Sequence, residues 1–106
     1  MITIKQGESY PIYFTLKVDD MILIPDMIQE IKICIGDFHK TYSSGGVRFD
    51  EQTQEWWIWP SQEETLAMSA DRVNVCAHVK CQNGAVYIER LGRIEVWDPG
   101  CCKEAI

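Results

Sequence analysis

The sequence has 106 residues, of which 46% are hydrophobic and 25% are charged, and its 16 acidic side chains outnumber 10 basic ones to give a net charge of −6. This length and composition suit one folded domain with one core and lack the polarity that keeps chains disordered. The negative field repels phosphate groups, so we expect neither a nucleic-acid partner nor an anionic membrane surface.

The N-terminal residues and the cysteines indicate the compartment. Residues 1–7 lack the basic segment and apolar run of a signal peptide, and no later stretch is apolar for long enough to cross a bilayer. The cysteines are odd in number and follow no disulfide framework, which fits a reducing compartment: Cys34, Cys76, Cys81, Cys101 and Cys102. We therefore expect a cytoplasmic protein with no membrane partner.

The first third of the chain predicts a hairpin followed by a buried strand. Apolar and more polar side chains alternate through residues 12–18, which is typical of a strand with one buried face. The two aspartates at 19–20 predict a turn into the apolar run 21–24. Pro and Asp at 25–26 interrupt that run, and isoleucines at alternate positions of 31–35 predict the next strand.

The middle of the chain predicts three strands and a flexible loop. Ser-Ser-Gly-Gly at 43–46 separates a short strand that ends near Tyr42 from another over residues 47–49. The run Glu55–Trp59 is aromatic and β-branched, and such side chains favour a pleated, half-buried sheet. We expect it to form the third strand.

A short helix is predicted directly after this strand. Residues 61–64, Ser-Gln-Glu-Glu, fit a capping box in which the Ser61 hydroxyl accepts from an early helix amide and the Glu64 carboxylate accepts from the Ser61 amide. We expect one or two helical turns through residues 65–68. Residues 69–71 are long enough only to connect this helix to the next strand.

The clearest strand and the clearest hairpin lie near the end of the chain. Residues 73–81 alternate strictly between apolar and polar positions apart from one cysteine. Asn83-Gly84 tolerates the positive φ angles of a tight hairpin, so residues 85–91 are expected to return as the partner strand. A separate last strand is predicted over residues 93–97, before the breaker sequence Asp-Pro-Gly at 98–100.

Together these elements predict an all-β protein, a sandwich of short antiparallel strands with one short helix. Residues 1–98 are expected to form the single domain, and residues 99–106 a flexible C-terminal tail.

The order of these elements also resembles a known family. The resemblance rests on a hairpin near Tyr13–Leu16, the isoleucine strand, Gly36, Lys40-Thr41-Tyr42, the tryptophan strand, Gln62-Glu63-Glu64-Thr65 and the hairpin at Asn83-Gly84. Over most of residues 2–97 the chain resembles the N-terminal domain of phage baseplate upper proteins from prophages of Gram-positive bacteria. This resemblance implies an immunoglobulin-like antiparallel β-sandwich that docks within a tail or baseplate assembly. Those proteins continue into receptor-binding segments, so a sequence that ends at Ile106 implies a smaller joining part.

Three tryptophans within four residues are the most unusual feature of the sequence. Strand alternation sends Trp56 and Ile58 to one face and Trp57 and Trp59 to the other. Two interpretations of Trp57 and Trp59 stay open: a loop or a second sheet covers them, or they anchor a protein interface. With Tyr13, they are the candidate protein-interaction residues.

The cysteines and histidines raise the question of a metal site. Cys76 and His78 share one face of a predicted strand, and Cys34 could approach them with the ligand chemistry of zinc. The paired spacing of structural zinc sites is missing, so we predict no metal and no cofactor. Cys101 and Cys102 lie in the tail and are predicted to be free thiols, because adjacent cysteines rarely bridge each other.

No motif in the sequence predicts catalysis. Capping by Glu64 and solvation of Glu63 account for that pair of carboxylates. There is no Gly-rich phosphate loop, serine elbow or His-Glu helix motif. We expect no catalytic residues, no enzyme activity and no small-molecule substrate.

The predicted function is therefore that of a non-catalytic structural or accessory protein of a phage or prophage. We expect a protein–protein interaction module, cytoplasmic in the bacterial host or associated with the virion, whose partner is another tail component or a second copy. The alternative is a small acidic phage-encoded inhibitor that blocks the basic channel of a host nucleic-acid-binding enzyme.

Overall fold

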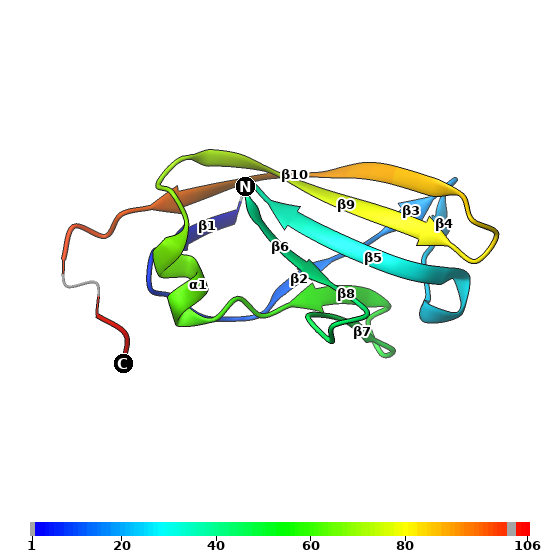
Figure 1. Cartoon of the computed structure of the whole chain (residues 1–106), viewed down its shortest axis with the longest axis horizontal. Helices are drawn as coiled ribbons and strands as arrows, with labels where there is room; N and C mark the ends of the chain where they lie inside the picture. The colour runs from blue at the N-terminus through cyan, green and yellow to red at the C-terminus, as the bar shows by residue number, and fades with distance from the viewer. Residues whose placement is uncertain (1, 102–103) are drawn as a thin grey trace.

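The protein is built mainly from β-strands, which form two larger sheets and one separate two-stranded hairpin (Figure 1). The computed structural model describes residues 2–101 and 104–106. The larger sheet has five strands in the order β1 (Ile2–Lys5), β10 (Val86–Trp97), β9 (Arg72–Cys81), β5 (Ile28–Ile35) and β6 (Phe38–Thr41). The smaller has three, in the order β2 (Ile12–Phe14), β8 (Glu55–Ile58) and β7 (Val47–Asp50). The predicted all-β class is confirmed, whereas the sandwich architecture and its immunoglobulin-like arrangement stay predictions.

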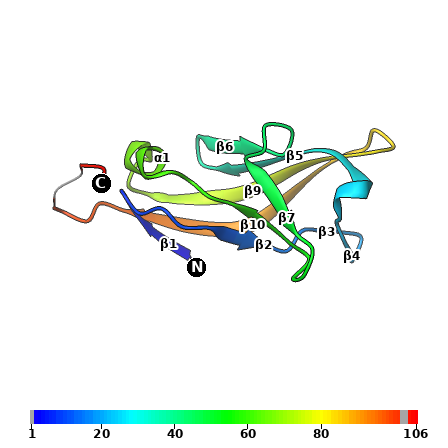
Figure 2. The same cartoon turned by 90° about the horizontal axis from the view of Figure 1, so that it is seen from below.

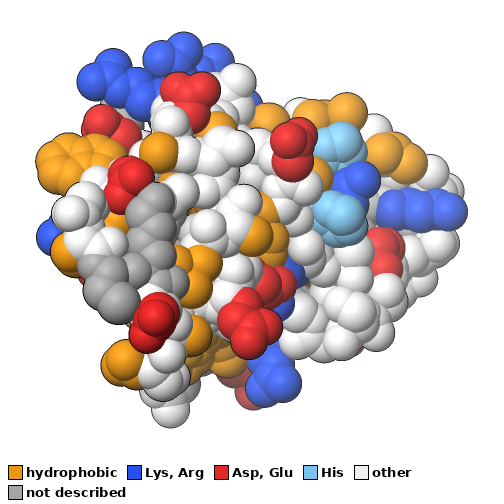
Figure 3. All heavy atoms as spheres, turned by 60° about the vertical axis from the view of Figure 1, so that its left-hand side comes forward, with side chains coloured by type: hydrophobic (Ala, Val, Ile, Leu, Met, Phe, Trp, Pro, Cys, Tyr) orange, Lys and Arg blue, Asp and Glu red, His pale blue; other side chains and the backbone are white. Residues whose placement is uncertain are grey.

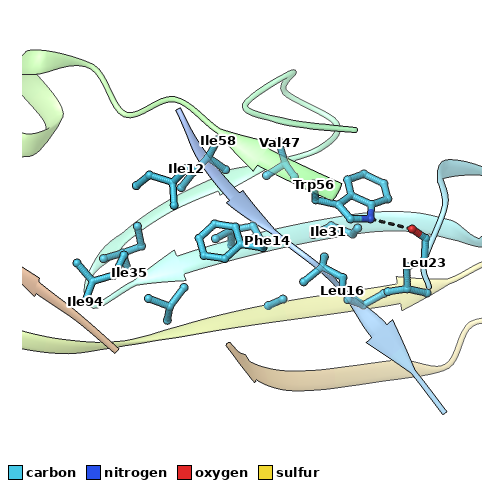
Figure 4. Close-up of a cluster of buried hydrophobic side chains, with 14 of the residues drawn as sticks. Ile12, Phe14, Leu16, Leu23, Ile31, Ile35, Val47, Trp56, Ile58 and Ile94 are labelled. Carbon is cyan, nitrogen blue, oxygen red and sulfur yellow. Dashed lines mark hydrogen bonds between the residues drawn. The ribbon is translucent and has the colours of Figure 1, made fainter. Parts of the chain in front are cut away.

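One core lies between the two sheets. Seen from below, β7 crosses in front of β9 and β10 (Figure 2). Ile31, Ile33 and Ile35 of β5 are at most 2% exposed, as their alternation predicts. Figure 4 shows Ile31 and Ile35 on the same side as the labelled side chains of the small sheet. The core residues are Ile4, Ile12, Phe14, Leu16, Leu23, Ile28, Ile31, Ile33, Ile35, Val47, Trp56, Ile58, Met68, Val75, Ala77, Val79, Ile94 and Val96.

Trp56 is the largest fully buried side chain, and it is 0% exposed. Its ring packs against the rings of Phe49 and Tyr42, with centroids 4.9 and 5.5 Å away. Its indole Nε1–H donates a hydrogen bond of 2.9 Å to the Leu23 carbonyl oxygen, drawn as a dashed line in Figure 4. A buried indole needs such an acceptor, so this bond holds β8 and the segment at Leu23 in one relative position.

The predicted first hairpin is present, but its strands are shorter. Residues 12–18 do not form one strand: β2 ends at Phe14, and β3 (Lys17–Val18) leaves the small sheet to pair with β4 (Met21–Ile22). The side chains still alternate as predicted, because each of the two strands keeps its apolar residues towards the core. Asp19 and Asp20 have φ angles of 51° and 64°, the left-handed conformation that a two-residue hairpin turn requires.

The C-terminal strands differ from prediction in one respect. The hairpin at Asn83-Gly84 is confirmed, but the expected separate strands 85–91 and 93–97 are a single strand, β10. The register against β9 shifts between Arg90 and Gly92, which makes Leu91 a β-bulge. The bulge takes up the extra residue, so the ladder continues on both sides of it.

The large sheet also has an edge that the sequence did not predict. β1 runs parallel to β10, from Ile2 opposite Ile94 to Lys5 opposite Trp97, whereas the other paired strands of this sheet are antiparallel. Only Ile4 of this strand is buried, at 1% exposure. One buried side chain gives no alternation from which a strand could be recognised.

The helix is held at the end of the sheets by its cap and by the N-terminal loop. In α1 (Gln62–Ala67) the predicted capping box is confirmed: the Glu64 amide donates to Ser61 Oγ at 3.1 Å, and the Ser61 amide donates to Glu64 Oε1 at 2.8 Å. Buried Thr65 donates to the Glu8 carbonyl at 2.8 Å and accepts from the Gly7 amide at 3.0 Å. The other helix is the single 3-10 turn η1 (Pro25–Met27), and no helix among the described residues is long and apolar enough to cross a membrane.

We expect Trp56→Phe to lower the free energy of unfolding by about 1–3 kcal/mol, because the buried Leu23 carbonyl loses the indole donor while ring packing is largely kept. Urea denaturation followed by circular dichroism measures the change. Trp97→Phe is the matched control, since Trp97 is 48% exposed. Equal stability of the two variants would show that the indole hydrogen bond does not hold the core together.

The capping box makes stability depend on pH through Glu64. Burial opposes ionisation of this carboxyl, but hydrogen bonds from Ser61 and the ion pair with Lys40 at 3.0 Å outweigh it and lower the pKa below the usual 4.5. The stabilisation is therefore complete above pH 4.5 and is lost as the pH falls through the lowered pKa. Gln can still accept from the Ser61 amide, so Glu64→Gln should be less stable than wild type at pH 7 and approach it at low pH in urea melts.

Candidate protein-interaction site

The aromatic side chains singled out in the sequence lie together on the outer face of the small sheet. Tyr13 of β2 and Arg48 of β7 are both direct cross-strand partners of Trp57 in β8. The ring centroids of Tyr13 and Trp57 are 6.2 Å apart, and those of Trp57 and Trp59 are 6.5 Å apart. We call Tyr13, Arg48, Trp57 and Trp59 the aromatic surface.

This surface is open to solvent yet held in place. Trp59 is 53% exposed and Tyr13 is 44% exposed, while Trp57 between them is half-buried. The indole Nε1–H of Trp59 donates to Ser9 Oγ at 3.0 Å, and that hydroxyl donates to the Pro60 carbonyl at 2.9 Å. The interpretation in which a loop or second sheet covers Trp59 is therefore wrong. The hydrogen bond to Ser9 holds the Trp59 ring in one position in the unbound protein.

Positive charge lies beside the rings. The Arg48 guanidinium is 5.7 Å from the centroid of the Trp57 ring, and its Nε donates to the Gly45 carbonyl at 3.3 Å. Lys40, Gly45, Gly46, Arg48, Trp57 and Trp59 line a shallow hollow of about 270 Å³. Lys40 is paired with Glu64 at 3.0 Å, so Arg48 supplies the positive charge beside the exposed indole, and the hollow suits an apolar partner surface that carries an acidic group.

Sequence reasoning missed Arg48 and Ser9. The alternation of Val47, Arg48 and Phe49 in a predicted strand already indicated an outward Arg48. Its position opposite Trp57 depends on the pairing of β7 with β8, which the sequence did not give. Ser9 lies in an irregular segment and meets Trp59 through the tertiary fold alone.

The cysteines and histidines considered as metal ligands lie on the outer face of the large sheet. Cys34 is the direct cross-strand partner of both Cys76 and His39, whereas His78 lies opposite Lys32. The two histidines of the chain are visible in pale blue in Figure 3. Among the described residues, no group of three or more His, Cys, Asp or Glu side chains is placed to hold a metal ion.

The comparisons with known proteins give no family for this chain: no family model, no curated protein and no solved structure matches it. The site is therefore defined by its own geometry.

We expect the thiols to react at different rates in the native protein. Cys101 is exposed, and Cys102 lies outside the described residues. Burial raises the pKa of the half-buried Cys34 thiol, an effect that Lys32 opposes and Cys76 increases. Because the thiolate is the nucleophile, Cys101 should alkylate with iodoacetamide faster than Cys34 at pH 8. Timed quenching and peptide mass spectrometry measure both rates, and equal rates would contradict the placement of Cys34 in β5.

Proposed function

We propose that this protein is a non-catalytic interaction module that docks on a protein partner through the aromatic surface. The observation that carries the proposal is the gathering of Tyr13, Trp57 and Trp59 into one exposed cluster with Arg48 beside it. Tryptophan, tyrosine and arginine are the residue types that dominate binding energy in compact protein interfaces.

The rigidity of the cluster supports this role. Each ring lies on or directly after a sheet strand, and Trp59 is also bonded to Ser9. Side chains that are already ordered lose little conformational freedom on binding, so more of the contact energy remains as affinity. The exposed indole of Trp59 would in turn lose unfavourable contact with water when a partner covers it.

The proposed setting is a phage or prophage tail or baseplate, as the resemblance in sequence implies. A module with a rigid aromatic surface would join two larger parts of such an assembly. The alternative, an acidic inhibitor of a nucleic-acid-binding enzyme, has less support, because Glu64 is engaged by Ser61 and Lys40. On the face shown in Figure 3, the acidic side chains are also separated from one another by other residues.

Capture experiments with the tagged 106-residue chain test the proposal. Wild type should recover virion structural proteins from lysates of induced lysogenic cells. Trp57→Ala and Trp59→Ala should each reduce that recovery about 30-fold, the effect of losing roughly 2 kcal/mol at an interface anchor. Trp97→Ala is the matched control, because Trp97 is 48% exposed but lies in β10 of the other sheet.

The two candidate functions predict opposite responses to salt and charge. Binding through the rings should persist at high ionic strength and should not change with Glu63→Lys, since Glu63 is exposed and lies in α1. Recovery of a host nuclease, lost with added salt and with Glu63→Lys but retained by Trp59→Ala, would refute the proposal and support the inhibitor. Equal loss in the Trp59→Ala and Trp97→Ala variants would also refute it.

A further inference from the structure

The strand β10 has an edge that is only partly paired. On the side away from β9, β1 covers residues from Ile94 to Trp97. Residues 86–93 have no neighbouring strand on that side within the described part of the chain. The part before the bulge at Leu91 is a regular strand, so its backbone groups form an open template for another strand.

The direction of these backbone groups follows from the hairpin. The Cys81 amide donates to the Ala85 carbonyl at 2.8 Å, so this is a hydrogen-bonded pair of the antiparallel ladder. Hydrogen-bonded and non-hydrogen-bonded pairs alternate along such a ladder. The backbone groups of Val86, Ile88 and Arg90 therefore point away from β9, towards the open edge.

The side chains at this edge are unusually apolar for their exposure. Ile88 is 65% exposed, Val86 is 63% exposed and Tyr87 is 37% exposed. Exposed edges are usually protected by charged side chains, lysine above all, or by proline; residues 86–88 contain none of these, although Glu89 and Arg90 follow. The bulge at Leu91 limits the template at one end but leaves residues 86–90 regular.

We propose that this edge pairs with the same edge of a second copy of the chain, in an antiparallel, two-fold symmetric arrangement. A two-fold axis at Ile88 places that residue opposite itself, Val86 opposite Arg90 and Tyr87 opposite Glu89. No like charges face each other in this register, and Val86 and Ile88 of both copies lie on the same face of the joined sheet, with Tyr87 on the other. Contacts of this isologous kind are self-complementary by construction.

The charge balance of β10 and the length of its open edge also favour a second copy of the chain as the binding partner. Two copies that each carry a charge of −6 repel at long range, but β10 itself is balanced: Glu89 and Glu95 match Arg90 and Arg93. The start of β1 opposite Ile94 limits the incoming strand to a short segment, which residues 86–90 of the second copy match. The contact is small, so a weak, concentration-dependent dimer is expected.

Sedimentation equilibrium of the 106-residue chain tests the inference. Wild type should shift from monomer to dimer between about 10 µM and 1 mM, the range of weak interfaces. Ile88→Pro should abolish the shift, because proline removes an amide that points to the open edge and leaves the β9 ladder intact. Ile88→Lys should abolish it through charge repulsion at the two-fold axis. Met21→Lys is the matched control, since Met21 is 59% exposed and lies in β4.

A second measurement keeps the test valid if a variant folds poorly. In wild type, hydrogen exchange at the amides of Val86, Ile88 and Arg90 should slow as the protein concentration rises. Trp59→Ala should keep both this protection and the dimer, which separates the inference from the proposed function. If the wild type stays monomeric up to about 1 mM, the dimer inference is wrong. A strand from a different protein would then be the better candidate to pair with the open edge of β10. A dimer that survives Ile88→Pro, or that Trp59→Ala abolishes, would overturn the inference as well.

Discussion

The burial of Trp56 is the interaction on which the rest of the structure depends. Its indole fills the space between the two sheets and donates to the Leu23 carbonyl, which ties β8 to the segment before η1. Successive side chains of a strand point to opposite faces, so fixing Trp56 inward fixes Trp57 outward. A slip of one residue would bury Trp57 and expose Trp56 and Ile58. The core and the aromatic surface are therefore consequences of a single register.

Strand pairing in the small sheet brings the residues of the aromatic surface together. β2 and β7 pair with β8 on either side, so Tyr13 and Arg48 align with Trp57 in one row across three strands. Trp59 lies beyond the end of β8, where sheet pairing no longer orients it, and the bond to Ser9 takes over that role. Sheet geometry and one loop hydrogen bond together give an ordered surface with exposed indole.

The aromatic surface and the open edge of β10 are neighbours. A hollow of about 500 Å³ has Tyr13 of β2 on one side and residues 91–94 of β10 on the other. A second copy paired along residues 86–90 would lie next to this hollow, so dimerisation would place two aromatic surfaces in one assembly. Two weak sites on one particle bind a repeated partner far more tightly than either alone, which suits a component of a symmetric structure.

Local patterns in the sequence determined much of this protein. The alternation at 31–35 and 73–81, the capping box at 61–64, the turns at 19–20 and 83–84 and the outward direction of Trp57 and Trp59 all follow from interactions between near neighbours. Tertiary structure alone decided what depends on distant pairing: the parallel strand β1, the continuity of β10 through its bulge, and the meeting of Tyr13, Arg48 and Ser9 with the tryptophans. Such pairings join backbone groups, which are the same in every residue, so the sequence carries no local sign of which strands will meet.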